Sequence, residues 1–335
     1  MKNIGMYGGS FNPLHLGHVN DIIIASSTVK KLYVVLSVSN VPGEIDHRTR
    51  FMWLNHIAGI LPNVEVIKVF DNSINKEVYD WNKGRDDILK ETGPIDVVFC
   101  GDDYKGTNRF EHLYPNSEIH YFDRNEIKIS STEIRKNPYK YWAYLPDIVK
   151  PYYTKKVMVV GTESCGKTTL VKNLALAYNT TYVEEVGRYI CADAGGMANM
   201  LPEDYEKIIY KHKVREAEEL KKANKVLFID TEALITLYYY KLQFGDTDEY
   251  KEAFEKLART TADLNKYDLW LYLEPDVKWV DDGARTYGEQ EVREKNNIIL
   301  KEILAELNVE YQCISGDYQD RFVKSKKLVN RLLRK

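Results

Sequence analysis

The stretch KKVMVVGTESCGKTTLVKNLALAY (155–178) decides the fold of its half of the chain. It opens with a β-branched apolar run, typical of a buried strand, and ends in a helical pattern. Between them, GTESCGKT (161–168) fits the pattern G-x-x-x-x-G-K-[ST] in the strand-to-helix context that this motif requires. The backbone N–H groups of such a loop hold phosphates, its lysine reaches the β- and γ-phosphates, and its last hydroxyl binds Mg²⁺. We therefore expect a nucleoside triphosphate site, with Lys167 catalytic and Thr168 on the metal, formed by Gly161, Thr162, Glu163, Ser164, Cys165, Gly166, Lys167, Thr168 and Thr169.

The same alternation of short apolar runs and helical patterns extends along the whole chain. The segments between the runs are long enough for crossover helices, which predicts parallel sheets. The expected strands are 3–8, 31–39, 64–70, 96–101, 118–123, 155–161, 181–186, 225–230, 268–275 and 311–315. At 335 residues the chain has room for two cores, so we predict two doubly wound α/β domains, 1–150 and 151–335. The aromatic, proline-containing stretch 137–153 is predicted to be a packed connector between them.

Composition excludes several classes of protein. The 47 basic and 50 acidic residues balance, so we expect neither a nucleic-acid nor a membrane partner. No N-terminal signal pattern and no bilayer-length apolar run is present. The four cysteines form no CxxC pair, which argues against a zinc site or a disulfide framework and favours a reducing cytoplasm. The sequence leaves the oligomeric state open, a homo-oligomer included.

The stretch GGSFNPLHLGHVN (8–20) carries two histidines at another predicted strand-to-helix turn. Glycines allow the backbone to approach a ligand closely, and a helix N-terminus favours an anion. Spaced by three, His15 and His18 are expected to face the same side. The alternative is a loop with two surface histidines, but the context predicts a nucleotide phosphate site.

The stretch IKISSTEIRK (127–136) predicts a second anion-binding helix start in the first domain. Ser130 and Glu133 have the S-x-x-E spacing of a capping box, which marks a helix N-terminus. Capping explains Ser130, but it does not explain the accompanying Thr132 and Arg135.

Three further features belong to the second domain. Asp230 ends the apolar run KVLFID and is expected to hold Mg²⁺ through water, the alternative being an N-cap of the following helix. Glu185 and Arg188 follow another strand, either as an acceptor-side carboxylate and a phosphate contact or as a surface ion pair. In VKWVDDGARTYG (277–288), Arg285 beside a glycine suits a lid over the transferring phosphate, against the alternative of an exposed turn.

Taken together, these motifs carry a family resemblance. GSFNPLHLGH with ISSTEIR resembles the paired signatures of the HxGH nucleotidyltransferase superfamily. With the connector, GTESCGKT and WVDDGAR in this order, nearly the whole chain resembles the NadR family, whose members are bifunctional nicotinamide-nucleotide adenylyltransferases and ribosylnicotinamide kinases. The resemblance implies that the second domain phosphorylates nicotinamide riboside with ATP. It also implies that the first domain joins nicotinamide mononucleotide to the AMP part of a second ATP, giving NAD and pyrophosphate.

Roles for single residues follow from this chemistry. The attacking phosphate oxygen needs no protein base, so the first site must position two anions and neutralise growing charge. There we expect catalysis by His15, His18 and Arg135, assisted by Mg²⁺. Hydrogen-bond donors to the nucleotide are expected from Ser130, Ser131 and Thr132, and further nucleotide contacts from Arg50 and Asp102. The loop around the nucleotide is expected to consist of Gly8, Gly9, Ser10 and Phe11. In the kinase we expect Lys167, Thr168, Asp230 and Arg285 at the phosphates, Trp279 on the nicotinamide ring, and Glu185, Asp281 or Asp282 on the ribose, with Arg188 nearby.

Some family members carry an N-terminal helix-turn-helix repressor domain. Here the HxGH signature begins within ten residues of Met1, so we expect no such domain. Two alternatives stay open: a bifunctional enzyme acting on another nucleoside, and a non-enzymatic ATP or NAD sensor. The sequence does not distinguish the amide from the acid form of nicotinamide, nor does it reveal channelling or feedback by NAD.

Overall fold

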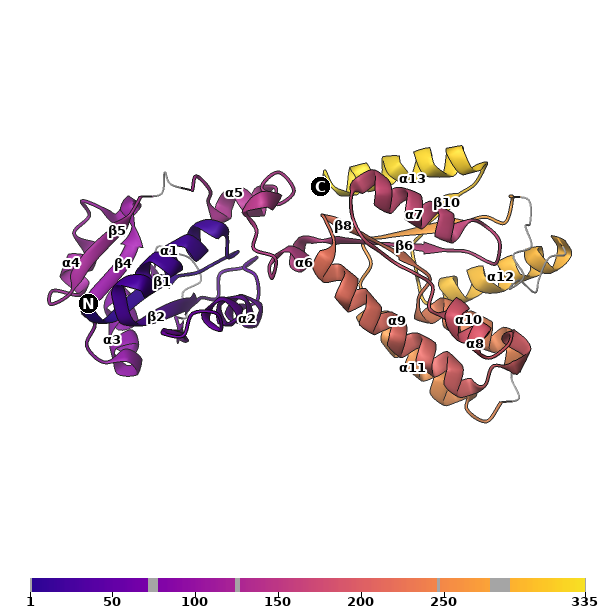
Figure 1. Ribbon diagram of the computed structural model, residues 1–335, viewed down its shortest axis with the longest axis horizontal. Coiled ribbons are helices and arrows are strands. Elements are labelled where there is room, and N and C mark those ends of the chain that lie inside the picture. The colour runs from indigo at the N-terminus through magenta and orange to yellow at the C-terminus, as the bar shows by residue number, and fades with distance from the viewer. Residues whose placement is uncertain (1, 72–77, 124–126, 246–247, 278–289, 335) are drawn as a thin grey trace. The chain divides into compact units, whose positions relative to one another are not determined.

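The computed structural model describes residues 2–71, 78–123, 127–245, 248–277 and 290–334. The chain divides into two compact units, Met1–Tyr152 and Tyr153–Lys335, and each is described by itself. Figure 1 shows that each unit is a sheet with helices packed around it.

The first unit is built on a parallel sheet in the order β3-β2-β1-β4-β5. Its strands are β1 (Lys2–Gly9), β2 (Val29–Val38), β3 (Val64–Phe70), β4 (Val97–Gly101) and β5 (Glu118–Phe122). Its helices are α1 (Leu16–Thr28), α2 (His47–Ala58), α3 (Trp81–Thr92), α4 (Arg109–Leu113) and α5 (Ser131–Lys136), with the 3₁₀ turns η2 (Asp102–Tyr104) and η3 (Trp142–Tyr144). α6 (Lys150–Tyr153) leads to the second unit.

The second unit has a parallel sheet in the order β10-β9-β6-β8-β7. Its strands are β6 (Lys155–Val160), β7 (Tyr182–Val183), β8 (Val226–Asp230), β9 (Leu269–Leu273) and β10 (Gln312–Ile314). Its helices are α7 (Lys167–Tyr178), α8 (Gly187–Asp193), α9 (Pro202–Lys222), α10 (Ala233–Phe244), α11 (Lys251–Leu264), α12 (Gln290–Glu306) and α13 (Tyr318–Leu332), with the 3₁₀ turn η4 (Met197–Asn199). The predicted fold class is confirmed, although the strand expected at 181–186 is only two residues long.

Alternation along each central strand explains why helices cover both faces. Val157 and Val159 of β6 pack with residues of α7 and α13 on one face. Met158 and Val160 pack with α10 and α12 on the other. Strands buried on both faces read as continuous apolar runs, as VMVV does. Each buried aliphatic side chain adds about 1.5–3 kcal/mol to stability.

Strand order also fixes where ligands bind. In a doubly wound sheet the crevice lies at the carboxyl ends of the strands, where the direction of winding reverses. That point falls between β1 and β4 in the first sheet and between β6 and β8 in the second. Among the described residues, no helix combines the length and the apolar character needed to cross a membrane.

Candidate active sites

A cavity of about 440 Å³ lies at the switch point of the first sheet. Its lining includes the ends of β1 and β4 and the start of α5, so the two predicted signatures, 9–18 and 129–135, meet at one site although they are at least 111 positions apart in sequence. Ten predicted residues line it: Gly8, Gly9, Ser10, Phe11, His15, His18, Ser130, Ser131, Thr132 and Arg135.

The two histidines face the same side, as the spacing predicts. Their rings stack with centroids 3.6 Å apart. His15 is the N-cap of α1, and its Nδ1 accepts from the backbone N–H of His18 at 3.4 Å. A Cβ on Gly17 would lie 3.1 Å from the His15 ring, so glycine leaves the space that the ring occupies. His15 is buried and held from three sides.

The start of α5 is fastened to the histidine loop by two hydrogen bonds. Ser131 Oγ donates to the carbonyl of Pro13 at 2.9 Å, and Arg135 donates to the carbonyl of Asn12. Arg135 also donates to Thr132 Oγ1 at 3.2 Å. The predicted capping box of Ser130 is present in both directions. These bonds explain why Thr132 and Arg135 accompany the cap.

Two residues that are predicted to contact the nucleotide, Arg50 and Asp102, do not line this cavity. Arg50 is 1% exposed and is not part of the cavity wall. It donates to the carbonyl of Ser10 at 2.7 Å and pairs with Glu44 at 3.2 Å, so it supports the loop that contains Ser10 from outside the cavity. Asp102 starts η2 outside the lining, whereas its neighbour Asp103 lies in the wall.

An aromatic wall of the first cavity was not anticipated from the sequence. It consists of Tyr79, Trp81, Tyr104, Phe110 and Tyr114. Trp81 packs edge-on against Tyr79 with centroids 4.8 Å apart, and the Arg109 guanidinium lies 4.6 Å from the Trp81 ring centroid. Such a wall suits a flat ring. Its residues come from separate segments, which is why no local pattern revealed them.

A second cavity, of about 340 Å³, lies at the switch point of the second sheet. The expected phosphate loop follows β6 and has the left-handed backbone that such a loop needs at Ser164 (φ 59°) and Gly166 (φ 82°). A Cβ on Gly161 would lie 2.6 Å from the carbonyl of Leu273, so only glycine fits beside β9. Within the part of the chain that the structure describes, Ser164 Oγ is buried with no hydrogen-bond partner, as expected of a group that binds an anion.

The residues that are predicted to bind phosphate and Mg²⁺ lie close together. Lys167 is buried and donates to the carbonyl of Thr162 at 2.9 Å. Burial opposes its charge, but Cys165, Glu185 and neighbouring acids outweigh burial, so the pKa of Lys167 is raised. Thr168 Oγ1 donates to Asp230 Oδ2 at 2.5 Å. Burial, and then the charge of Glu185, raise the pKa of Asp230 to about 6.

The alternative of Asp230 as a helix N-cap is wrong. Thr231 follows in a left-handed turn (φ 70°), and Glu232 caps α10 by accepting from the N–H of Leu234 at 2.7 Å. Asp230 is therefore left to face Thr168, opposite Val159 of β6 in the sheet.

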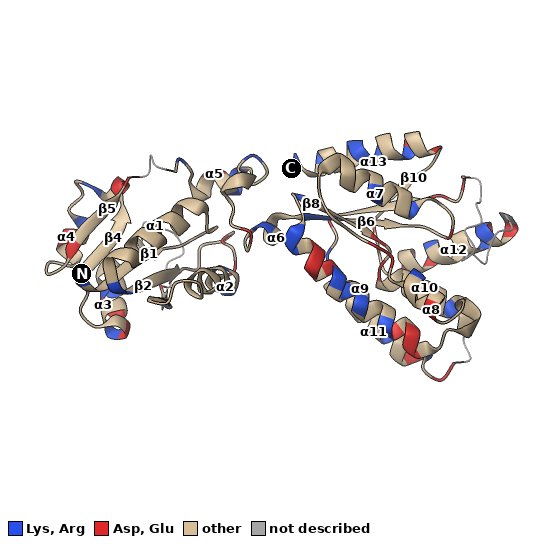
Figure 2. Cartoon of the chain, in the orientation of Figure 1, with Lys and Arg blue, Asp and Glu red and all other residues tan. Residues whose placement is uncertain are grey.

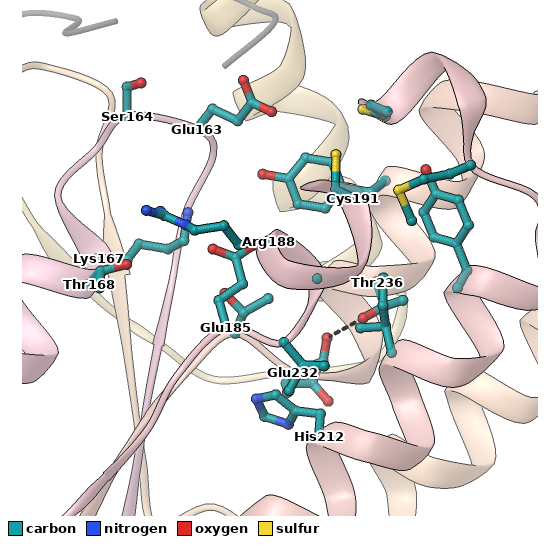
Figure 3. A pocket seen from close by; sticks show the side chains of 18 of the residues that line it. Glu163, Ser164, Lys167, Thr168, Glu185, Arg188, Cys191, His212, Glu232 and Thr236 are labelled. Atoms are coloured by element: carbon teal, nitrogen blue, oxygen red, sulfur yellow. Dashed lines mark hydrogen bonds between the residues drawn. The ribbon is translucent and has the colours of Figure 1, made fainter. Parts of the chain in front are cut away.

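The remaining wall of this cavity comes from several helices (Figure 3). Glu185 and Arg188 line it, as predicted. The cavity is also lined by residues that no sequence motif indicated, namely Cys191, Met197, Met200, Tyr205, His212, Glu232, Thr236 and Tyr239. Trp279, Asp281, Asp282 and Arg285 lie outside the described residues.

A buried arginine that no sequence motif indicated holds the expected phosphate loop. Arg321 of α13 is 1% exposed. It donates to the carbonyl of Cys165, to that of Gly316 at 2.7 Å and to that of Glu274 at 2.8 Å, and it pairs with Asp276. The guanidinium thus ties the loop to the ends of β9 and β10.

Comparisons with known proteins agree with both halves. The model of the Cytidylyltransferase-like family matches residues 6–137, and that of the AAA domain matches 156–321. The "Trifunctional NAD biosynthesis/regulator protein NadR" of Escherichia coli K12 is 31% identical over 353 residues, covering 99% of this chain and 84% of its own length. Crystal structures of NadR protein with NR, and with NAD and AMP-PNP, superpose with TM-scores of 0.83 and 0.82. Each is 24% identical and covers 100% of this chain and 97% of its own, which supports the fold.

Proposed function

The chain belongs to the family of the NadR proteins, and on this premise we propose that each of its two units carries one step of NAD synthesis. In the second unit, the 5′-hydroxyl of nicotinamide riboside attacks the γ-phosphorus of ATP and releases ADP. In the first unit, the phosphate of the resulting mononucleotide attacks the α-phosphorus of a second ATP, giving NAD and pyrophosphate. The observation that supports this division is the presence of two different phosphate sites, each at the switch point of its own sheet.

In the adenylyl step the protein positions two anions. Stacked His15 and His18, with Arg135 beside them, supply donors to the bridging and leaving oxygens. The aromatic wall around Trp81 receives the nicotinamide ring in this proposal, since it lines the same cavity as the histidines.

In the kinase step Lys167 and the loop amides hold the phosphates, while Glu185 and Arg188 line the acceptor side. Thr168 and Asp230 are the hard oxygen groups that suit Mg²⁺, and they are adjacent. When bound, Mg²⁺ neutralises charge on the β- and γ-phosphates. Chelation should stop phosphorylation, and added Mg²⁺ should restore it.

We also propose small-molecule partners only, without nucleic acid, and a cytoplasmic location. ATP and pyridine nucleotides are substrates there, and all four cysteines are free thiols, as expected in a reducing compartment.

The test is product analysis of two variants with two substrates. His18→Ala should lower NAD formation from mononucleotide roughly 10²–10³-fold, the scale of one lost preorganised donor, and leave riboside phosphorylation intact. Lys167→Ala should give the reverse pattern. Circular dichroism checks that both variants fold. Loss of both reactions in both folded variants would contradict the assignment of one reaction to each unit.

A further inference from the structure

Glu232 is a buried acid in the kinase cavity that the proposed chemistry does not use. Its side chain lines the cavity and is 1% exposed. Oε1 accepts from the N–H of Leu234 at 2.7 Å. Oε2 is buried and, among the described residues, has no hydrogen-bond partner.

A buried carboxyl oxygen without a partner is costly, and native structures seldom keep one without a reason. Two side-chain atoms of the described cavity wall are in this state, Ser164 Oγ and Glu232 Oε2. Ser164 belongs to the phosphate loop, so its missing partner is a phosphate oxygen. In the view of Figure 3, Glu232 and His212 lie away from Ser164, beyond Glu185. Glu185 is the carboxylate of the proposed acceptor side, so we assign Glu232 to that side as well.

The backbone holds Glu232 in place before any ligand arrives. Thr231 has a φ of 70°, which β-branched residues rarely adopt, and its N–H donates to the carbonyl of Val159 at 3.2 Å. Thr236 Oγ1 donates to the backbone carbonyl of Glu232 at 3.2 Å (Figure 3). Strain fixed by surrounding bonds is typical of sites whose groups must be preorganised.

A hydroxyl group can supply the partner that Oε2 lacks within the described part of the chain. A hydroxyl can donate to the ionised form or accept from the protonated form, so it satisfies Oε2 in either state.

We propose that Glu232 Oε2 hydrogen-bonds a ribose hydroxyl of the acceptor riboside, and so selects ribosides over their deoxy analogues. This inference rests on the proposed kinase function and deepens it. Sites built to bond a substrate hydroxyl strongly reject the analogue that lacks it, because the buried protein group is then left unpaired.

The experiment compares the full chain with the variant Glu232→Ser, using nicotinamide riboside and its 2′-deoxy and 3′-deoxy analogues with ATP. Serine is a good N-cap, so the variant keeps the cap of α10 and loses only the carboxyl group that extends into the cavity. The wild type should prefer the riboside over at least one analogue by 10²-fold or more in kcat/KM. In Glu232→Ser the riboside value should fall about 10–10²-fold while that for the analogue changes little, so discrimination collapses.

Glu216→Ser is the matched control. Glu216 is equally buried, but both of its oxygens have partners, Lys156 at 3.1 Å and Tyr267 at 3.0 Å, and it does not line the cavity. It should lower the melting temperature and keep the discrimination. Circular dichroism and a thermal melt of the same samples report the amount of folded protein.

The outcomes distinguish a failure of the proposed kinase function from a failure of the role proposed for Glu232. A wild type that phosphorylates no riboside overturns the proposed kinase function and this inference together. A wild type that discriminates, with Glu232→Ser losing all three substrates equally, overturns the inference alone and leaves Glu232 a structural cap.

Discussion

Replacing Gly17 by alanine should separate stability from catalysis in the adenylyl site. Gly17 occupies the first turn of α1, between the two stacked histidines in sequence. An added Cβ would stand 3.1 Å from both Cε1 and Nδ1 of His15, closer than nine in ten real Cβ contacts. The His15 ring must then retreat by a few tenths of an ångström.

The size of the effect follows from the confinement of that ring. His15 is 6% exposed, and the His18 ring stacks on it at 3.6 Å. A misplacement of about 1 Å can cost 10²-fold in rate, so a few tenths should cost about tenfold in kcat for NAD formation. The helix itself gains, because alanine in place of glycine stabilises a helical position by roughly 0.5–1 kcal/mol. We therefore expect a melting temperature at or above that of the wild type.

The assay pairs a thermal melt with steady-state NAD formation from mononucleotide and ATP. Ser27→Ala is the control: it also improves the propensity of α1, at an exposed position away from the site, and should leave kcat unchanged. Unchanged kcat in Gly17→Ala would refute the claim that glycine protects the position of His15. Equal losses of stability and activity would refute it as well, because the damage would then be general.

Three other expectations can be measured on the same protein. Arg285→Ala should lower the kinase kcat on the order of 10²-fold with little change in the KM for ATP, since we predict from its lid-like sequence segment that it stabilises the transition state; a raised KM alone would assign it to ground-state binding. Arg321→Lys should raise the KM for ATP in the kinase step about tenfold, because three guanidinium nitrogens bond three separate carbonyls and the single nitrogen of lysine cannot replace them. Arg259 pairs with Glu255 and Glu306, and the control Arg259→Lys should leave this KM unchanged. DNA binding should be weak and salt-sensitive, because opposite charges alternate along surfaces such as α9 (Figure 2); nanomolar, sequence-selective binding at physiological salt would show that a reader of DNA was missed.

The fold and the position of the loop 161–168 could be predicted because their sequence signals are local. A strand, a glycine turn and a helix follow each other within 24 residues at 155–178, and every step leaves a pattern in the sequence. The capping box at Ser130 is equally local and has the predicted bonds. Pairing the two signatures of the first unit needed the family resemblance, since the bonds from Ser131 and Arg135 to the histidine loop span 118 and 123 positions.

What sequence could not supply is the direction in which a chemically suitable side chain points. Arg50 has the charge to hold a phosphate, yet it lies outside the cavity, on the carbonyl of Ser10. Asp230 and Glu232 are two acids in one short turn, and the sequence indicated the N-cap role, as an alternative, for Asp230 alone. The left-handed backbone at Thr231 decides between them, because it turns Asp230 toward Thr168 and gives the cap to Glu232. A strained φ in a β-branched residue leaves no mark in composition or periodicity, and it depends on bonds such as that from Thr231 to Val159 in another strand. Residue type therefore predicts which chemistry is present at this edge of the sheet, and the long-range contacts decide which atom performs it.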